Sequence, residues 1–275
     1  MRWALVLTIV AAIGTAPLGA QSAAKLSRTE VVVIADLSNR IDGRLHAGQV
    51  ARDTAIVHLI AAQFGKLVKR NLFLFSRDRL RMVYVGGQAG PEEPRVDVAH
   101  MNEAGQVVVK KLPYALEAFT RSAAQPYFAR RTEFQGADLW SWFHKTAPNT
   151  LPVSDPDREV RTRIIVLTDG YLEFGPRISR EAGTSMRMAA LRGKANWERL
   201  YPQYKLKSSG TKLLNTEVLV LELSPIRPMV NTTEQDIIER YWSDWFGDMG
   251  AKSSFLTAND ALPSVQDAIE KFLAP

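Results

Sequence analysis

The hydrophobic positions of this chain form two recurring patterns, continuous apolar runs and apolar residues at helical spacing. In residues 30–35, Glu30 is followed by five apolar residues without alternation, three of them valine, which is typical of a strand buried on both faces of a parallel sheet. From Gln49 onward, six apolar residues recur on one helix face before a second apolar run at 72–76. These six are Val50, Ile56, Val57, Leu59, Ile60 and Phe64. Residues 30–76 therefore predict a strand, a helix and a second strand.

The pattern loosens over residues 79–112, where glycines and prolines indicate loops around two short strands. We place these strands at 82–85 and 106–110, and we expect them to form an elaboration at one edge of the sheet, such as an antiparallel addition. Helical spacing returns over 112–122 and again over 139–143.

The last third of the chain repeats the alternation of strands and helices. The expected elements are a strand at 163–168, a helix at 184–200, a strand at 217–223, a helix opened by a capping box of Thr232 and Gln235, a strand at 253–257 and a helix carrying Leu262, Val265, Ile269 and Phe272. This order predicts an α/β fold: a doubly wound, mostly parallel, Rossmann-like sheet with helices on both faces. We assign it to one domain, residues 30–275, after a short leader, residues 21–29.

Four aromatic residues lie at i, i+4 spacing on the helix that opens at Thr232. They are Tyr241, Trp242, Trp245 and Phe246. Such a cluster suits either an exposed partner-binding patch or the core, and an aromatic stripe on a helix of this fold class is more often core. We therefore predict that these side chains are buried.

The first 20 residues differ from the rest. Arg2 precedes an apolar stretch at 3–13, and small residues with Pro17 follow up to Ala20. This is the pattern of a Sec-type signal peptide, which predicts a periplasmic or secreted protein with no membrane span after cleavage. Retention of the segment as an N-terminal anchor is the alternative.

Composition narrows the function classes. The 275 residues include no cysteine, which excludes disulfides and a zinc site built from cysteines. The net charge of +6 is dispersed along the chain rather than gathered in one tract, so we do not expect a nucleic-acid partner. The four histidines show no metal-binding spacing, which argues against a zinc hydrolase.

Polar residues follow two of the predicted strands. Asp36 and Ser38 come directly after the first strand, and Asp169 follows the strand at 163–168. Because parallel strands deliver such residues to one edge of the sheet, we expect these side chains to lie close together. Carboxylate and hydroxyl oxygens suit a hard cation, so the sequence predicts a site for Mg²⁺ or Mn²⁺.

These residues resemble a von Willebrand factor A-type (vWA) domain, whose metal-ion-dependent adhesion site uses D-x-S-x-S, a threonine on a second loop and an aspartate on a third. Asp36 and Ser38 match the opening motif, and Asp169 matches the third loop in its T-D-G form. The resemblance covers about residues 30–273 as an order of elements. It implies an adhesion module in which an acidic residue of a partner protein completes the coordination of the ion.

The motif is incomplete, and this leaves three interpretations of the site. Arg40 replaces the second serine, and Ala137 stands where the family has its threonine. In the first interpretation, Asp36, Ser38 and Asp169 keep the ion and a further oxygen replaces the lost ligands. The candidates for that oxygen are Asp138, Asp42 and Thr132.

In the second interpretation the site is metal-free, with the guanidinium of Arg40 between Asp36 and Asp169 in place of the ion. In the third the two aspartates are structural, Asp36 capping a helix and Asp169 forming a turn.

We expect a non-enzymatic protein-protein interaction module, used in adhesion or as a scaffold. A phosphohydrolase-like enzyme is one alternative, although Ser38 occupies the position where such an enzyme carries a second acidic residue. The other alternative is a structural subunit of an envelope assembly that uses its helical faces.

Overall fold

The computed structural model describes residues 28–44, 46–70, 74–86, 95–97, 106–128, 136–151, 160–172, 190–206, 210–225, 232–257 and 260–274. The predicted signal peptide, most of the predicted leader and Thr132 lie outside the described residues.

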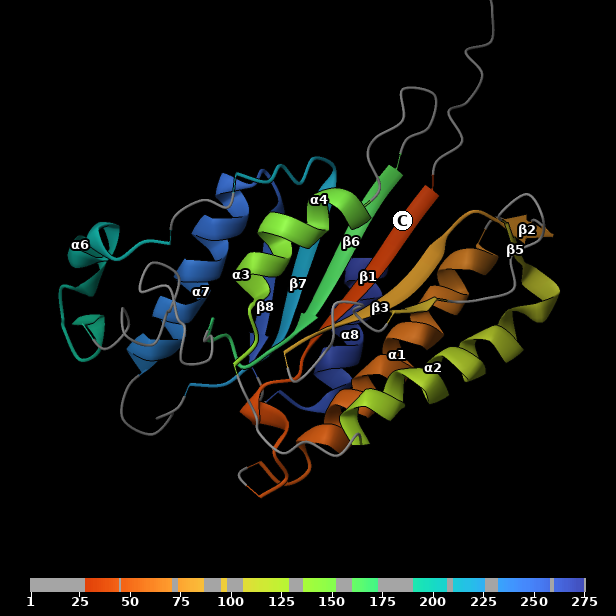
Figure 1. Ribbon diagram of the computed structural model, residues 1–275, viewed down its shortest axis with the longest axis horizontal. Helices are drawn as coiled ribbons and strands as arrows, with labels where there is room; N and C mark the ends of the chain where they lie inside the picture. The colour runs from red at the N-terminus through yellow and green to blue at the C-terminus, as the bar shows by residue number, and fades with distance from the viewer. Residues whose placement is uncertain are drawn as a thin grey trace, which may run out of the picture.

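A six-stranded sheet in the order β4-β3-β1-β6-β7-β8 forms the centre of the protein (Figure 1). The strands are β1 (Arg28–Asp36), β3 (Arg79–Val85), β4 (Arg95–Asp97), β6 (Val160–Leu167), β7 (Thr216–Leu223) and β8 (Lys252–Thr257). All neighbours pair in parallel except β4, which pairs antiparallel with β3 at one edge. The predicted doubly wound, mostly parallel sheet is therefore confirmed. An antiparallel strand does extend one edge, but it is β4, in a stretch predicted as loop, and the strand predicted at 106–110 is not part of this sheet.

Helices cover both faces of this sheet (Figure 1). One face carries α1 (Gln49–Lys69), α2 (Leu112–Phe128) and α8 (Leu262–Leu273). The other carries α7 (Thr232–Asp248) and a segment made of α3 (Leu139–Ser141), a π-helical turn η3 (Trp142–Thr146) and α4 (Ala147–Thr150). The other short helices with bounds in the described part of the chain are η1 (Asn39–Ile41), η2 (Val109–Lys111), α6 (Trp197–Leu200) and η4 (Tyr201–Gln203).

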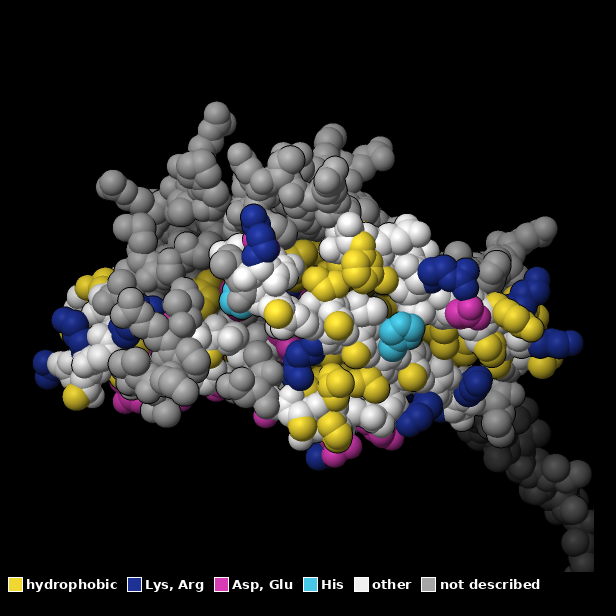
Figure 2. Space-filling model, turned by 90° about the horizontal axis from the view of Figure 1, so that it is seen from below, with side chains coloured by type: hydrophobic (Ala, Val, Ile, Leu, Met, Phe, Trp, Pro, Cys, Tyr) yellow, Lys and Arg dark blue, Asp and Glu magenta, His cyan; other side chains and the backbone are white. Residues whose placement is uncertain are grey.

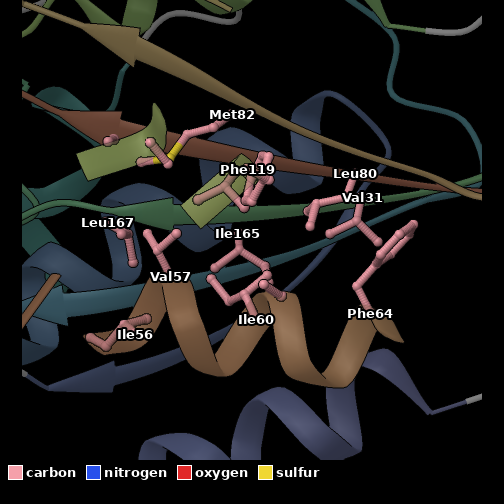
Figure 3. Packing of buried hydrophobic residues seen from close by; sticks show 14 of the residues in the cluster. Val31, Ile56, Val57, Ile60, Phe64, Leu80, Met82, Phe119, Ile165 and Leu167 are labelled. Atoms are coloured by element: carbon pink, nitrogen blue, oxygen red, sulfur yellow. The ribbon is translucent and has the colours of Figure 1, made fainter. Parts of the chain in front are cut away.

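The central strands β1, β3, β6 and β7 supply alternate side chains to two separate cores. Val31 and Val33 of β1 pack in the core beneath α1, whereas Val32 and Ile34 pack in the core beneath α7. Figure 3 shows the first core, where Ile60 and Phe64 point from α1 toward the sheet. This burial on both faces explains why the strands are apolar without alternation.

The aromatic cluster of α7 is buried, as predicted. Tyr241, Trp242 and Trp245 are each 1% exposed, and Phe246 is fully buried. The rings of Trp245 and Phe246 also pack edge-on against Phe143 of η3. This helix face therefore belongs to the core and is not a surface for partners.

The predicted second strand is wrong in its position in the sheet. Residues 75–76 form β2 (Phe75–Ser76), which pairs with β5 (Val107–Val108) in a separate two-stranded ribbon. The strand that pairs in parallel with β1 on the side away from β6 is instead β3. Only residues 82–85 of β3 were expected to be a strand, and as part of the edge elaboration. Arg79 and Arg81 interrupt the apolar pattern of β3. The guanidinium of Arg81 is nevertheless held inside, 3.2 Å from Glu30 and 2.6 Å from the carbonyl of Thr150.

The predicted helix at 184–200 is not continuous where the structure describes it. Residues 192–196 are not helical, and within the predicted range only the four residues of α6 are helical after them. Gly193 takes a left-handed backbone with φ of 71°, which ends helical geometry at that point. The predicted residues before 190 lie outside the described part.

None of the helices among the described residues has the length and apolarity needed to cross a membrane.

Candidate functional site

The carboxyl ends of β1 and β6 meet at the point predicted from the sequence. Ala35 pairs with Leu167, which places Asp36 beside Thr168 at the end of the two strands. The Thr168 hydroxyl donates to Asp36 Oδ2 at 2.7 Å, and the Ser38 backbone N–H donates to Asp36 Oδ1 at 2.8 Å. Asp36 and Thr168 are both fully buried. Thr168 was not among the predicted site residues, although it is the threonine of the T-D-G motif.

Asp169 follows Thr168 at the same end of the sheet and is partly exposed. Its Oδ1 accepts a hydrogen bond from the Tyr171 N–H at 3.1 Å, and its carbonyl accepts one from Ser224 N at 3.0 Å. The Asp169 contact with Tyr171 is a turn-forming hydrogen bond of the kind that the structural interpretation predicts. The helix cap predicted for Asp36 is wrong, because the residue that caps η1 is Ser38. Asp36 and Asp169 thus share one edge, but the residue that touches Asp36 is Thr168.

The loop before α3 reaches the same edge. A Cβ on Gly86 would lie 3.3 Å from both Ala137 and the carbonyl carbon of Leu37, so this loop sits against the ends of β1 and β3. The neighbouring Asp138 uses Oδ1 to accept the Ser141 N–H at 2.7 Å, which caps α3. We call residues 36–38, 137–138 and 168–170 the carboxyl-end rim.

Arg40 lies inside the protein, only 3% exposed. Its guanidinium donates two hydrogen bonds, of 2.7 and 2.9 Å, to the carboxylate of Asp53 on α1. Nη1 also donates to the Asp36 carbonyl at 3.2 Å. Burial alone lowers the pKa of Arg40, but the adjacent carboxylate of Asp53 raises it above the ordinary value. The fork of Arg40 is therefore taken by Asp53 rather than by the two rim aspartates.

Asp53 was missed by the sequence analysis, although a signal for it was present. It lies three residues after Val50 and three before Ile56, on the apolar stripe of the predicted helix. A carboxylate on such a stripe is buried and needs a cation. It is fully buried here.

A polar network continues from this ion pair beneath the rim. Gln49 donates to Asp53 at 2.8 Å and to Glu222 of β7 at 3.0 Å, and Arg52 binds both carboxylate oxygens of Glu222. Glu222 is 2% exposed and has a left-handed backbone, with φ of 72°, at an irregularity of the β7–β8 pairing. Such a backbone is unfavourable for glutamate, so the contacts of its side chain must hold it.

The rim offers hard oxygens, but they are engaged with protein donors. Burial raises the pKa of Asp36, and the charge of Arg40 with the bonds from Ser38 and Thr168 offsets part of that rise. The Ser38 hydroxyl accepts the Arg40 N–H, and Asp138 caps α3. In the described part of the chain, no three Asp, Glu, His or Cys side chains gather as a metal-binding group. The residues thus fit an ion only in part, because binding one requires Asp138 or another oxygen to change partners.

Asp42, a suggested substitute ligand, is paired locally. Its carboxylate accepts hydrogen bonds from the side chain and backbone of Arg44, which lower the pKa of Asp42 to about 2. The hydrogen bonds of its carboxylate come from Arg44, which is not part of the carboxyl-end rim.

Comparisons with known proteins assign no family. No family model matches the chain, and no curated protein matches it. Among solved structures, it is similar to the pilus adhesin SpaC of Lactobacillus rhamnosus GG (10% identity, 90% of this chain, 30% of that chain, TM-score 0.46). It is also similar to the human COPII-coat protein Sec24c (9% identity, 90% of this chain, 32% of that chain, TM-score 0.37). The chain spans about a third of the length of these proteins. Its own strand order defines it as a doubly wound α/β protein.

Removing Arg40 tests whether the buried ion pair holds the rim. We expect Arg40→Met to lower the free energy of unfolding by about 3–5 kcal/mol, because it leaves Asp53 charged and unpaired in the core. Adding Asp53→Leu should restore part of that loss. Urea denaturation at neutral pH measures both effects. Arg44→Met, which removes a guanidinium that is 82% exposed, should leave the midpoint nearly unchanged. Equal effects at the two arginines would contradict the assignment.

Gly170 tests the turn that carries Asp169. A Cβ there would lie 2.6 Å from Ile238 and 2.7 Å from Leu223, in a backbone with φ of 95°. The matched control is Gly193, which also has a positive φ but no neighbour within 4 Å. Thermal or urea unfolding should show a loss of about 1–2 kcal/mol for Gly193→Ala and a further 1–3 kcal/mol for Gly170→Ala.

Proposed function

We propose that this protein is a non-catalytic, extracytoplasmic module of vWA type that binds a protein partner at the carboxyl-end rim. One observation carries the proposal. The chain leaves β1 toward β3 on one side and leaves β6 toward β7 on the other, so the strand order reverses between β1 and β6. Doubly wound sheets bind their ligands at this reversal, outside the carboxyl ends of the strands. Asp36, Ser38, Thr168 and Asp169 lie at that place.

The buried contacts beneath the rim support a role in binding. Thr168 joins β6 to Asp36, Arg40 joins β1 to α1, and Arg52 joins α1 to β7 through Glu222. A surface fixed in this way loses little conformational entropy when a partner docks, and this favours affinity. The partly exposed Asp169 is the rim carboxylate that a partner can reach.

The second part of the proposal is that the carboxyl-end rim binds a divalent ion. Asp36, Ser38 and Asp169 would hold Mg²⁺ or Mn²⁺, with Asp138 released from its cap to complete the protein ligands. The ion would offset the repulsion between the two aspartates and present a positive charge to an acidic residue of the partner. The acidic partner depends on this ion, because the guanidinium of Arg40 is buried on Asp53 and does not face a docking protein.

The proposed location is the periplasm or the cell exterior. It rests on the signal-peptide pattern of residues 1–20, and an N-terminal anchor is compatible with the same module.

Asp169→Asn tests the rim directly. We expect it to abolish capture of a protein partner from a solubilised envelope extract, because the negative charge of the partly exposed carboxylate is lost while the side-chain shape is kept. Asp267→Asn, an exposed substitution on α8, is the matched control and should capture normally. Circular dichroism and the unfolding midpoint should agree among the three proteins. Equal capture by the folded Asp169→Asn protein would remove the rim as the contact surface.

A calorimetric titration tests the ion separately. We expect Mg²⁺ or Mn²⁺ to bind the wild-type protein and to bind Asp169→Asn at least about tenfold more weakly, because one of the proposed oxygen ligands loses its charge. If the wild-type protein gives no heat of binding at any of several temperatures, the metal dependence is refuted. The rim would still stand as a contact surface.

A further inference from the structure

The amino end of the sheet carries a surface that the rim function does not use. Three large hydrophobic side chains are exposed there: Leu74 at 78%, Phe75 at 44% and Tyr114 at 74%. Three exposed lysines belong to the same elements. They are Lys69 at the end of α1 and Lys110 and Lys111 of η2. We call these six residues the amino-end patch.

The patch is held together by backbone contacts. The ribbon of β2 and β5 is extended by a hydrogen bond from the Val109 N–H to the Leu74 carbonyl at 3.0 Å. Lys110 and Lys111 follow Val109 directly, and Tyr114 lies in the first turn of α2. Apolar and basic side chains therefore share one small area.

Hydrogen bonds connect the amino-end patch to the first residues of β1. The Thr29 N–H of β1 donates to Asp78 at 2.8 Å, and Asp78 also accepts a bond from Ser76 of β2. The ribbon thus lies beside the point where residues 1–27 join β1, at the end of the sheet opposite to the rim (Figure 1). An apolar segment at 3–13 precedes that point.

The charge of the patch is not neutralised within the described structure. No described carboxylate forms an ion pair with Lys69, Lys110 or Lys111. The nearest acidic residues in sequence are Asp78, which is 5% exposed, and Glu117, which pairs with Arg121. In Figure 2 the right-hand end of the molecule shows Lys and Arg side chains around hydrophobic ones, with acidic side chains in smaller number among them.

We propose that the amino-end patch docks on the surface of an anionic lipid bilayer. Lysines attract anionic headgroups, while exposed Leu, Phe and Tyr side chains enter the boundary with the acyl chains. If residues 1–20 stay in the membrane, the seven residues 21–27 span at most about 25 Å, which keeps this end of the sheet near the bilayer. Docking here turns the carboxyl-end rim away from the membrane.

The chain contains no cysteine, so a dye that reacts with thiols labels only the one cysteine that is introduced. Leu74→Cys carries an environment-sensitive dye, and Glu198→Cys on α6, at the opposite side of the molecule in Figure 1, carries the control dye. The full-length gene is expressed and the protein is purified without further processing. Intact-protein mass spectrometry then shows whether residues 1–20 are still present. The protein is then mixed with vesicles of phosphatidylcholine, alone or with phosphatidylglycerol.

We expect the dye at residue 74, and not the dye at 198, to shift to the blue with the anionic vesicles, and high salt to reverse the shift. Lys110→Glu with Lys111→Glu should weaken partitioning by about tenfold or more. Lys194→Glu with Arg199→Glu makes the same charge change near α6 and should have little effect.

Equal partitioning to neutral vesicles, equal effects of the two charge reversals, or equal dye shifts at residues 74 and 198 would overturn the proposal. Binding of polyglutamate or a DNA oligomer through the same lysines, without vesicle binding, would assign the patch to another partner and would also refute it. None of these measurements involves the rim, so their outcome is independent of the proposed partner binding.

Discussion

Arg40 lies at the junction of β1 and α1, where its guanidinium reaches the carboxylate of Asp53 and the backbone of Asp36. The three residues are buried, so each charge depends on the others for compensation. This contact sets where the turn after β1 can lie, and that turn carries Asp36 and Ser38. Through Gln49 the same polar network continues to Glu222 on β7. The rim therefore has a rigid base that extends across the sheet.

The two ends of the sheet have different chemistry. The carboxyl end gathers oxygen atoms that accept hydrogen bonds from Ser38, Thr168 and Tyr171. The amino end exposes lysines beside Leu74 and Phe75. Because parallel strands place all their starts at one edge and all their ends at the other, a doubly wound fold separates such surfaces. A protein held at its amino end would present its rim to partners in solution.

Much of the fold was predictable because strands buried on both faces need continuous apolar runs, and β1, β6 and β7 have them. β3 was placed incorrectly because Arg79 and Arg81 interrupt its pattern, and the contacts that satisfy Arg81 come from β1 and α4. At the site, Asp36 and Asp169 were found from their positions after strands. The contact of Asp36 with Thr168 and the pairing of Arg40 with Asp53 were not found.

The sequence by itself determined the alternation of strands and helices, the burial of the α7 aromatics and the edge of the sheet at which polar residues collect. These properties depend on local periodicity and on where each strand ends. Only the tertiary structure decided that Arg40 faces inward and that the exposed Leu74 joins Lys110 and Lys111 in one patch. Such pairings arise between elements distant in the sequence, and the partner that a buried charge acquires is fixed by the packing of those elements.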